Sequence, residues 1–168
     1  MNLKDSKNIY IVYGVSGCGK TTIGKELAKN MDIPFYDADD FHPEANIKKM
    51  SKGNPLNDED RQPWLEIISK EMYLWKQEKG AVLACSALKN KYRDTLEFEN
   101  ENSVKWIFLE GSYSLIAERM QARKNHFFKP SMLTSQFETL EKPTKGVSVS
   151  INATIPDIIT DIKSKLTL

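Results

Sequence analysis

The run Gly14-Val-Ser-Gly-Cys-Gly-Lys-Thr21 constrains the fold of this chain more than any other, because it fills every fixed position of the pattern G-x-x-x-x-G-K-S/T. An apolar stretch over residues 9–13 precedes it and predicts a buried strand. After it, Ile23, Leu27 and Met31 recur every four residues and predict one face of a helix. A strand, a glycine-rich loop and a helix N-terminus together bind phosphate through backbone N–H groups. The sequence therefore predicts a site for a nucleoside triphosphate.

The residues of this loop suggest how it would hold the nucleotide. Its glycines lack a Cβ, so the backbone can curl and direct several N–H groups at one anion. The Lys20 ammonium can reach the β- and γ-phosphate oxygens, and the Thr21 hydroxyl can bind Mg²⁺. We therefore expect ATP and Mg²⁺ as cofactors. The expected nucleotide contacts from the loop are Gly14, Ser16, Gly17, Cys18, Gly19, Lys20, Thr21 and Thr22.

Composition narrows the class of protein. The 168 residues are expected to form one domain, 1–168, and the net charge of +1 gives no general attraction to nucleic acid or membrane surfaces. Two cysteines, Cys18 and Cys85, do not make a disulfide framework, which favours a reducing cytosol. The sequence shows neither the apolar run of a signal peptide nor one long enough to span a membrane. We expect a cytoplasmic protein with no nucleic-acid or membrane partner.

The rest of the chain alternates between strand and helix patterns. A helix is expected from Pro63 to Gly80 with Asp60 as its cap, another after Gly111, and a last one over residues 156–166. Further strands are expected at residues 33–36, 81–84, 104–109 and 147–151. Such alternation predicts right-handed βαβ units and an α/β fold whose parallel sheet is covered on both faces.

Ligands of such sheets bind beyond the carboxyl ends of the strands. Asp37 and Asp39 follow the second expected strand, where one carboxylate can order Mg²⁺ through water and the other can face an acceptor hydroxyl. Arg119 and Arg123 are spaced one helical turn apart, so they are expected on one helix face, where they can neutralise a phosphoryl group in transfer. A solvated acidic turn and a solvated helix face are the alternatives.

Outside the phosphate loop the chain contains the runs Asp37-Ala-Asp-Asp-Phe-His-Pro43, Asn46-Ile-Lys-Lys-Met50, Pro55-Leu-Asn-Asp-Glu-Asp-Arg61, Pro63-Trp-Leu65, Cys85-Ser-Ala-Leu-Lys89, Tyr92-Arg-Asp94, His126-Phe-Phe-Lys129 and Ser135-Gln-Phe-Glu-Thr-Leu-Glu141. These runs resemble the gluconokinases of the small P-loop type. The resemblance implies phosphorylation of D-gluconate by ATP to 6-phospho-D-gluconate. It also implies the P-loop kinase fold of shikimate and adenylate kinases, a three-layer αβα sandwich with a mostly parallel five-stranded sheet and a helical lid.

The same resemblance implies roles on the acceptor side. Asp37 would hold the water shell of the metal, and Asp39 would be the base that takes the proton of the acceptor hydroxyl. His42, Arg61 and Lys89 would contact the other hydroxyls and the carboxylate of gluconate. Arg61 is expected at the carboxylate, because its planar guanidinium suits that group.

On the nucleotide side, the resemblance places Arg119 against adenine and makes Arg123 a catalytic cation beside Lys20. Residues 124–136 would form a lid that excludes water. The lid begins with Asn125 where the family is expected to have glycine, and Asn152 stands where aspartate is expected. A homodimer is compatible with the resemblance.

Three other functions stay open at this level. A kinase of shikimate or of another small hydroxy acid would need the same parts. A nucleotide kinase would need further arginines for a second phosphate, and besides Arg119 and Arg123 only Arg61 and Arg93 precede the expected lid. A nucleotide-dependent binding module would hydrolyse ATP slowly and would expose an apolar docking patch.

Overall fold

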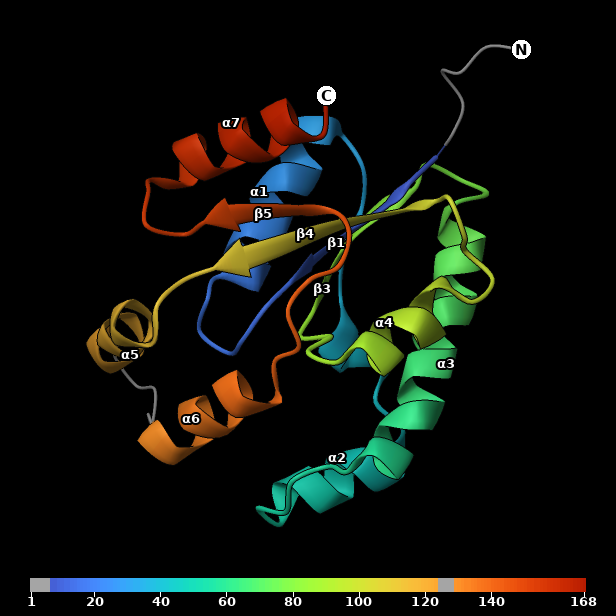
Figure 1. The fold of residues 1–168 in the computed structure, drawn as a ribbon. Helices are drawn as coiled ribbons and strands as arrows, with labels where there is room; N and C mark the ends of the chain where they lie inside the picture. Colours follow the sequence, from blue (N-terminus) through green and yellow to red (C-terminus); the bar gives the residue numbers. More distant parts are fainter. Residues whose placement is uncertain (1–6, 124–128) are drawn as a thin grey trace.

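The computed structural model describes residues 7–123 and 129–168. Five strands form one sheet in the order β2–β3–β1–β4–β5, and each neighbouring pair is parallel (Figure 1). This confirms the predicted α/β fold. The strands are β1 Ile9–Tyr13, β2 Phe35–Asp37, β3 Ala81–Cys85, β4 Val104–Glu110 and β5 Val147–Ser150.

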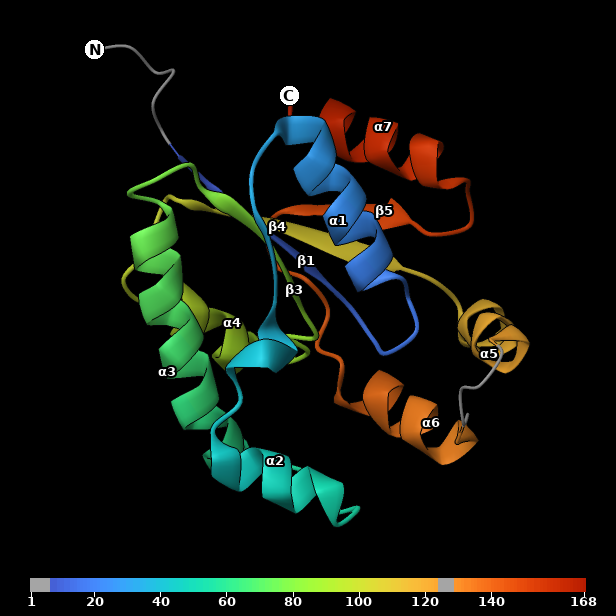
Figure 2. The same ribbon diagram turned by 180° about the vertical axis from the view of Figure 1, so that it is seen from behind.

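Helices cover both faces of the sheet and its carboxyl end. Helices α1 and α7 pack on one face, and α3 and α4 on the other, as the two views show (Figures 1 and 2). Helices α5 and α6 lie beyond the carboxyl end. The helices are α1 Lys20–Met31, a 3₁₀ helix Ala38–Phe41, α2 Glu44–Ser51, α3 Asp58–Trp75, α4 Asn90–Glu97, α5 Tyr113–Ala122, α6 Pro130–Thr139 and α7 Ile155–Lys165.

The position of β1 at the centre of the sheet explains why residues 9–13 form a continuous apolar run rather than an alternating one. All five of its residues are buried, because alternate side chains enter two different cores. Tyr10 and Val12 pack in the cluster with α1 and α7, while Ile9, Ile11 and Tyr13 pack in the cluster with α3. The phosphate loop therefore starts from a central strand that is paired on both sides and buried on both faces.

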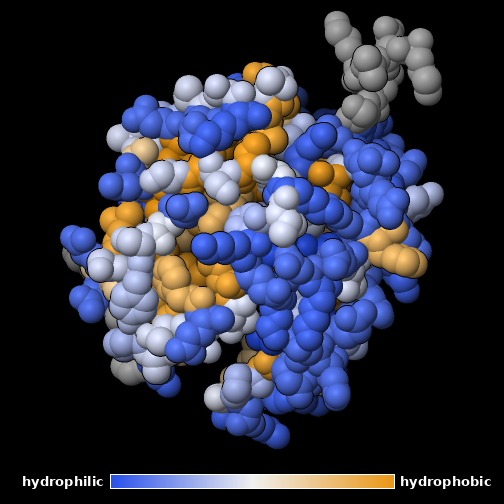
Figure 3. All heavy atoms as spheres, in the orientation of Figure 1, coloured by the Kyte–Doolittle hydropathy of each residue, from blue (hydrophilic) through white to orange (hydrophobic). Residues whose placement is uncertain are grey.

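The surface differs from one side of the molecule to the other. Over α2, α3 and α4 the view is mostly hydrophilic, whereas hydrophobic residues show between β5 and α6 (Figure 3). A hollow of about 400 Å³ at this end of the sheet is lined in part by Phe108, Leu109, Phe137 and Leu140. Helix α6 thus leaves a gap where it meets the sheet. In the described ranges, no helix has the length and apolar character needed to cross a membrane.

The start of α3 differs from the prediction. Asn57, not Asp60, is the cap: its side chain accepts from the Asp60 N–H (2.8 Å), while an Asp60 carboxylate oxygen accepts from the Asn57 N–H (2.9 Å). The helix begins at Asp58, so Pro63 lies in its second turn rather than its first. At the other end, α3 stops at Trp75 and the Gly80 N–H closes the following turn on the Trp75 carbonyl (2.9 Å).

Two other expectations need correction or limits. Helix α5 ends at Ala122, and Arg123 is its C-cap (φ −71°, ψ 121°), so Arg123 lies just past the helix that contains Arg119. Helix α4 was not predicted. Of the expected lid, residues 124–128, with Asn125, lie outside the described residues, and α6 contains the remainder from Pro130 onward.

Candidate active site

A cavity of about 510 Å³ lies where β1, β2 and β3 end. The phosphate loop, the acidic turn after β2, the end of β3 and Arg123 all contribute to its wall, as expected for the carboxyl end of a parallel sheet. Ser86 also lines it, a residue for which no role was predicted. The predicted site residues in this wall are Ser16, Gly17, Gly19, Lys20, Thr21, Thr22, Asp37, Asp39 and Arg123.

The phosphate loop has the geometry of an anion cradle. Gly17 has φ +83°, and a Cβ there would lie 2.6 Å from the Met120 side chain, so only glycine fits. The Lys20 ammonium folds over the loop and donates to the Gly14 and Val15 carbonyls, at 3.1 Å each. An arriving triphosphate would offer this ammonium oxygens of opposite charge in place of neutral carbonyls. The residues present therefore fit a nucleoside triphosphate.

Cys18 faces the core rather than the cavity. It is 1% exposed, and burial raises the pKa of its thiol. A Cβ on Gly14 would approach the Cys18 sulfur to 2.9 Å, so the glycine lets the loop close over this side chain. Both residues shape the loop from behind, and any contact of theirs with phosphate would come from the backbone.

The two aspartates of the acidic turn are held differently. Asp37 accepts from the Thr21 hydroxyl (3.4 Å) with one oxygen and from the Asp39 N–H (2.9 Å) with the other. Thr21 and Asp37 thus present two oxygen ligands side by side, which suits Mg²⁺. The Asp39 side chain opens into the cavity, but the cavity walls remove part of its hydration and raise its pKa, and the Asp37 charge adds to this rise. A carboxylate whose pKa is raised accepts a proton more readily.

His42 lies behind Asp39. Its ring stacks on Trp64 (4.3 Å between centroids), its Nδ1 is 3.3 Å from the Asn46 amide nitrogen, and its Nε2 is 3.9 Å from an Asp39 oxygen. The side chain is only 6% exposed, and burial lowers its pKa although Asp39 opposes that change. The lowered pKa favours the neutral ring, whose Nε2 faces Asp39 from beyond hydrogen-bond distance.

A smaller cavity of about 270 Å³ adjoins the first. Ser86 lines both, and α6 forms one side of the smaller one. Arg61 projects from α3 into its wall and donates to the Tyr92 hydroxyl (3.2 Å). Arg61 therefore lines a cavity that shares Ser86 with the phosphate site.

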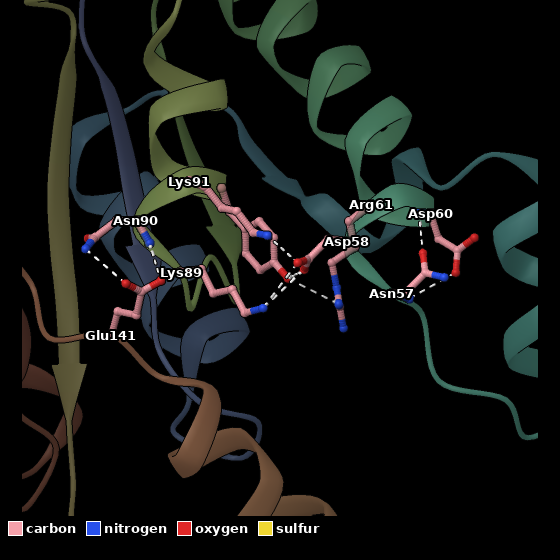
Figure 4. Close-up of polar contacts among 9 residues, drawn as sticks. Asn57, Asp58, Asp60, Arg61, Lys89, Asn90, Lys91 and Glu141 are labelled. Carbon is pink, nitrogen blue, oxygen red and sulfur yellow. Dashed lines mark hydrogen bonds and ion pairs between the residues drawn. The ribbon is translucent and has the colours of Figure 1, made fainter.

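Asp58 organises the cations beside this cavity (Figure 4). Its carboxylate accepts from Lys89 (3.2 Å to one oxygen), from Lys91 and from the Tyr92 hydroxyl, the same hydroxyl that accepts from Arg61. The Lys91 and Tyr92 bonds hold the pKa of Asp58 well below its usual range. Sequence reasoning gave Asp58 and Tyr92 no role, although both lie in runs that carry the family resemblance. Only the fold shows that these runs meet.

Arg119 lies apart from Arg123, on the side of the last strand. Its guanidinium donates to the Ile151 carbonyl (2.8 Å), which follows β5. Asn152 comes next in the chain and lines a further hollow of about 390 Å³ together with Gly111 and Leu115. Arg119 is therefore held beside the loop between β5 and α7.

Comparison with known proteins identifies the family. The chain matches the shikimate kinase family over residues 16–155. A probable gluconokinase from Dictyostelium discoideum is 44% identical over 174 aligned residues, which cover 96% of this chain and 87% of that protein. The chain belongs to the gluconokinase family. It is accordingly a kinase with a P-loop nucleotide site.

Two further relatives agree. The thermoresistant gluconokinase of Escherichia coli (strain K12) is 44% identical over 137 residues, with 81% of this chain and 78% of that protein covered. The crystal structure of a gluconokinase from Sinorhizobium meliloti 1021 superposes with a TM-score of 0.87 at 38% identity, covering 96% of this chain and 93% of that one. The gluconokinase fold therefore extends over almost the whole chain.

Proposed function

We propose that this kinase transfers the γ-phosphoryl group of ATP to the 6-hydroxyl of D-gluconate, giving ADP and 6-phospho-D-gluconate. The carrying observation is the pair of adjoining cavities that share Ser86, one shaped for a triphosphate and the other lined by Arg61. The relatives' names supply the acceptor, since cavities alone do not distinguish one small hydroxy acid from another.

On the nucleotide side, the backbone of Gly17 and Gly19, with Lys20, would hold the phosphates. Thr21 and Asp37 would hold Mg²⁺, the aspartate through water, and the ion would neutralise charge on the β- and γ-phosphate oxygens. Arg123 would act as a catalytic cation, because it lines the phosphate cavity together with Lys20. Arg119 would border adenine, a role compatible with its bond beside Asn152.

On the acceptor side, Asp39 would accept the proton of the attacking hydroxyl, helped by its raised pKa. Arg61 would bind the carboxylate of gluconate, with Lys89 adding positive charge to the same region. His42 would contribute through Asp39, which its Nε2 faces. We place the reaction in the cytoplasm, since both cysteines are buried thiols without a disulfide.

The test is ATP consumption by the purified protein with Mg²⁺ against D-gluconate, shikimate, other sugar acids, nucleoside monophosphates and water alone. We expect gluconate to stimulate ADP release far above the water background, and 6-phosphogluconate to accumulate in step with it. Stimulation by shikimate or by a nucleotide, and not by gluconate, would show that the acceptor is that compound and not gluconate. Hydrolysis that no acceptor stimulates would refute the proposal.

A further inference from the structure

Helix α6 is held in a defined place between the two cavities. Leu133 is 1% exposed and belongs to the core cluster that contains Val15 of the phosphate loop. Just past the helix, the Glu141 N–H donates to the Leu88 carbonyl (2.8 Å), and the Glu141 carboxylate accepts from the Asn90 N–H (3.2 Å). The side chains of α6 are therefore positioned relative to both the phosphate loop and the loop after β3.

One side chain of α6 reaches the phosphate loop directly. The Ser16 N–H donates to the Gln136 side-chain oxygen, at 3.1 Å. A backbone N–H can only donate, so the carbonyl end of this amide must face Ser16, and the NH₂ group with its two donors points elsewhere. Gln136 also lines the smaller cavity with Arg61 and Tyr92. Its amide thus lies between the phosphate site and the proposed acceptor site.

The surroundings of Gln136 suit a polyol. Ser131, Ser135 and Thr139 recur every four residues along α6, and all three line the same cavity as Gln136. Hydroxyls and an amide supply neutral donors and acceptors, which a chain of alcohol groups requires. Arg61 adds the positive charge that a carboxylate requires. Helix α6 therefore presents polar groups to the proposed acceptor, rather than only covering it.

We propose that Gln136 is a substrate-positioning residue that joins the acceptor to the phosphate loop. Its carbonyl oxygen stays on the Ser16 N–H, and its NH₂ group donates to a hydroxyl oxygen of the bound polyol acid. This inference rests on the proposed function, because it takes the smaller cavity as the acceptor site. An amide that contacts both the phosphate loop and the acceptor fixes the distance between them. Transfer between two bound reactants needs such a fixed distance.

The first test compares Gln136→Met with a matched control, Gln121→Met. Methionine keeps the length of the side chain and removes its hydrogen bonds, and Gln121 is exposed on α5. With Gln136→Met we expect the KM for gluconate to rise about tenfold, the effect of one lost hydrogen bond, and the KM for ATP to change about twofold or less. The control should match the wild type. Equal rises in both KM values would indicate a purely structural role and overturn the proposal.

The second test identifies direct contact. KM is measured for a series of monodeoxygluconates with wild type and Gln136→Met. For one of these analogues, the KM of the wild type should be about tenfold higher than its KM for gluconate. The KM of Gln136→Met should be the same for that analogue as for gluconate. Identical penalties in both proteins for every analogue would overturn the proposal. Failure of the proposed function is seen separately, as a lack of activity of the wild-type protein with gluconate. If the wild type phosphorylates another polyol acid instead, the deoxy series is made from that acid.

Discussion

Arg93 should contribute more to stability than any arginine of the active site. It is 5% exposed, and its guanidinium donates to the Ala87 carbonyl (2.6 Å), the Asn90 side-chain oxygen (2.6 Å) and the Glu141 carbonyl (3.0 Å). These bonds join α4 to the loop after β3 and to the segment that follows α6. The arginine therefore supports the frame on which both cavities are built.

The magnitude follows from those three acceptors. Arg93→Met leaves each without its donor, at about 1–3 kcal/mol for the buried Ala87 carbonyl and less for the two half-buried acceptors. Removal of a buried charge recovers part of this sum, because the charge no longer has to be desolvated. We expect a net loss of about 3 kcal/mol in the free energy of unfolding. With a urea m-value of about 1–3 kcal/mol/M, the midpoint should fall by about 1–3 M.

Urea unfolding followed by tryptophan fluorescence measures this loss, with Arg123→Met as the control. Arg123 is exposed, so its replacement should change the unfolding free energy by about 0.5 kcal/mol or less while it impairs catalysis. If both variants unfold at the same urea concentration as the wild type, the three bonds of Arg93 contribute nothing net. The reasoning would then be refuted.

Four further predictions concern the reaction. Lys20→Ala should lower kcat by about 10²–10³, because charge on the transferring group is no longer neutralised; near-normal turnover would refute the phosphate-site assignment. Asp39→Asn should bind ATP normally in a nucleotide titration but lose transfer by about 10²–10⁴. Because the pKa of Asp39 is raised in the free protein, wild-type kcat/KM should fall on acidification at a higher pH than an ordinary aspartate would give, since the protonated carboxyl cannot accept a proton; an acid limb at the ordinary value would contradict this. Arg61→Ala should raise the KM for gluconate roughly tenfold or more and that for ATP little; equal rises would contradict a carboxylate contact.

Local patterns were sufficient for the parts of the site that lie close together in the chain. The phosphate loop, the strand before it and the helix after it were predicted together, because their geometry depends on neighbouring residues. Asp37 and Asp39 were placed near the loop for a topological reason, since parallel strands end at the same edge of a sheet. The structure places both in one wall with Lys20.

Local patterns failed where the end of an element decided the outcome. The spacing of Arg119 and Arg123 fits one helix, but α5 ends at Ala122 and Arg123 lies just past it as the C-cap. Asn and Asp are both favoured N-cap residue types, so the sequence does not choose between Asn57 and Asp60. The extended backbone at Asn57 decides that this residue caps α3. Periodicity counts positions along a helix, but it does not say where the helix stops.

The sequence by itself determined the parallel α/β fold and the site of the phosphates, because glycine geometry and apolar periodicity act within a few residues. The tertiary structure alone decided which groups surround the acceptor. The Gln136 amide lies 120 positions from Ser16 along the chain, and Asp58 lies 31 from Lys89 and 34 from Tyr92. Such contacts depend on how whole helices pack at the end of the sheet, and no pattern within a short window of the chain records that packing.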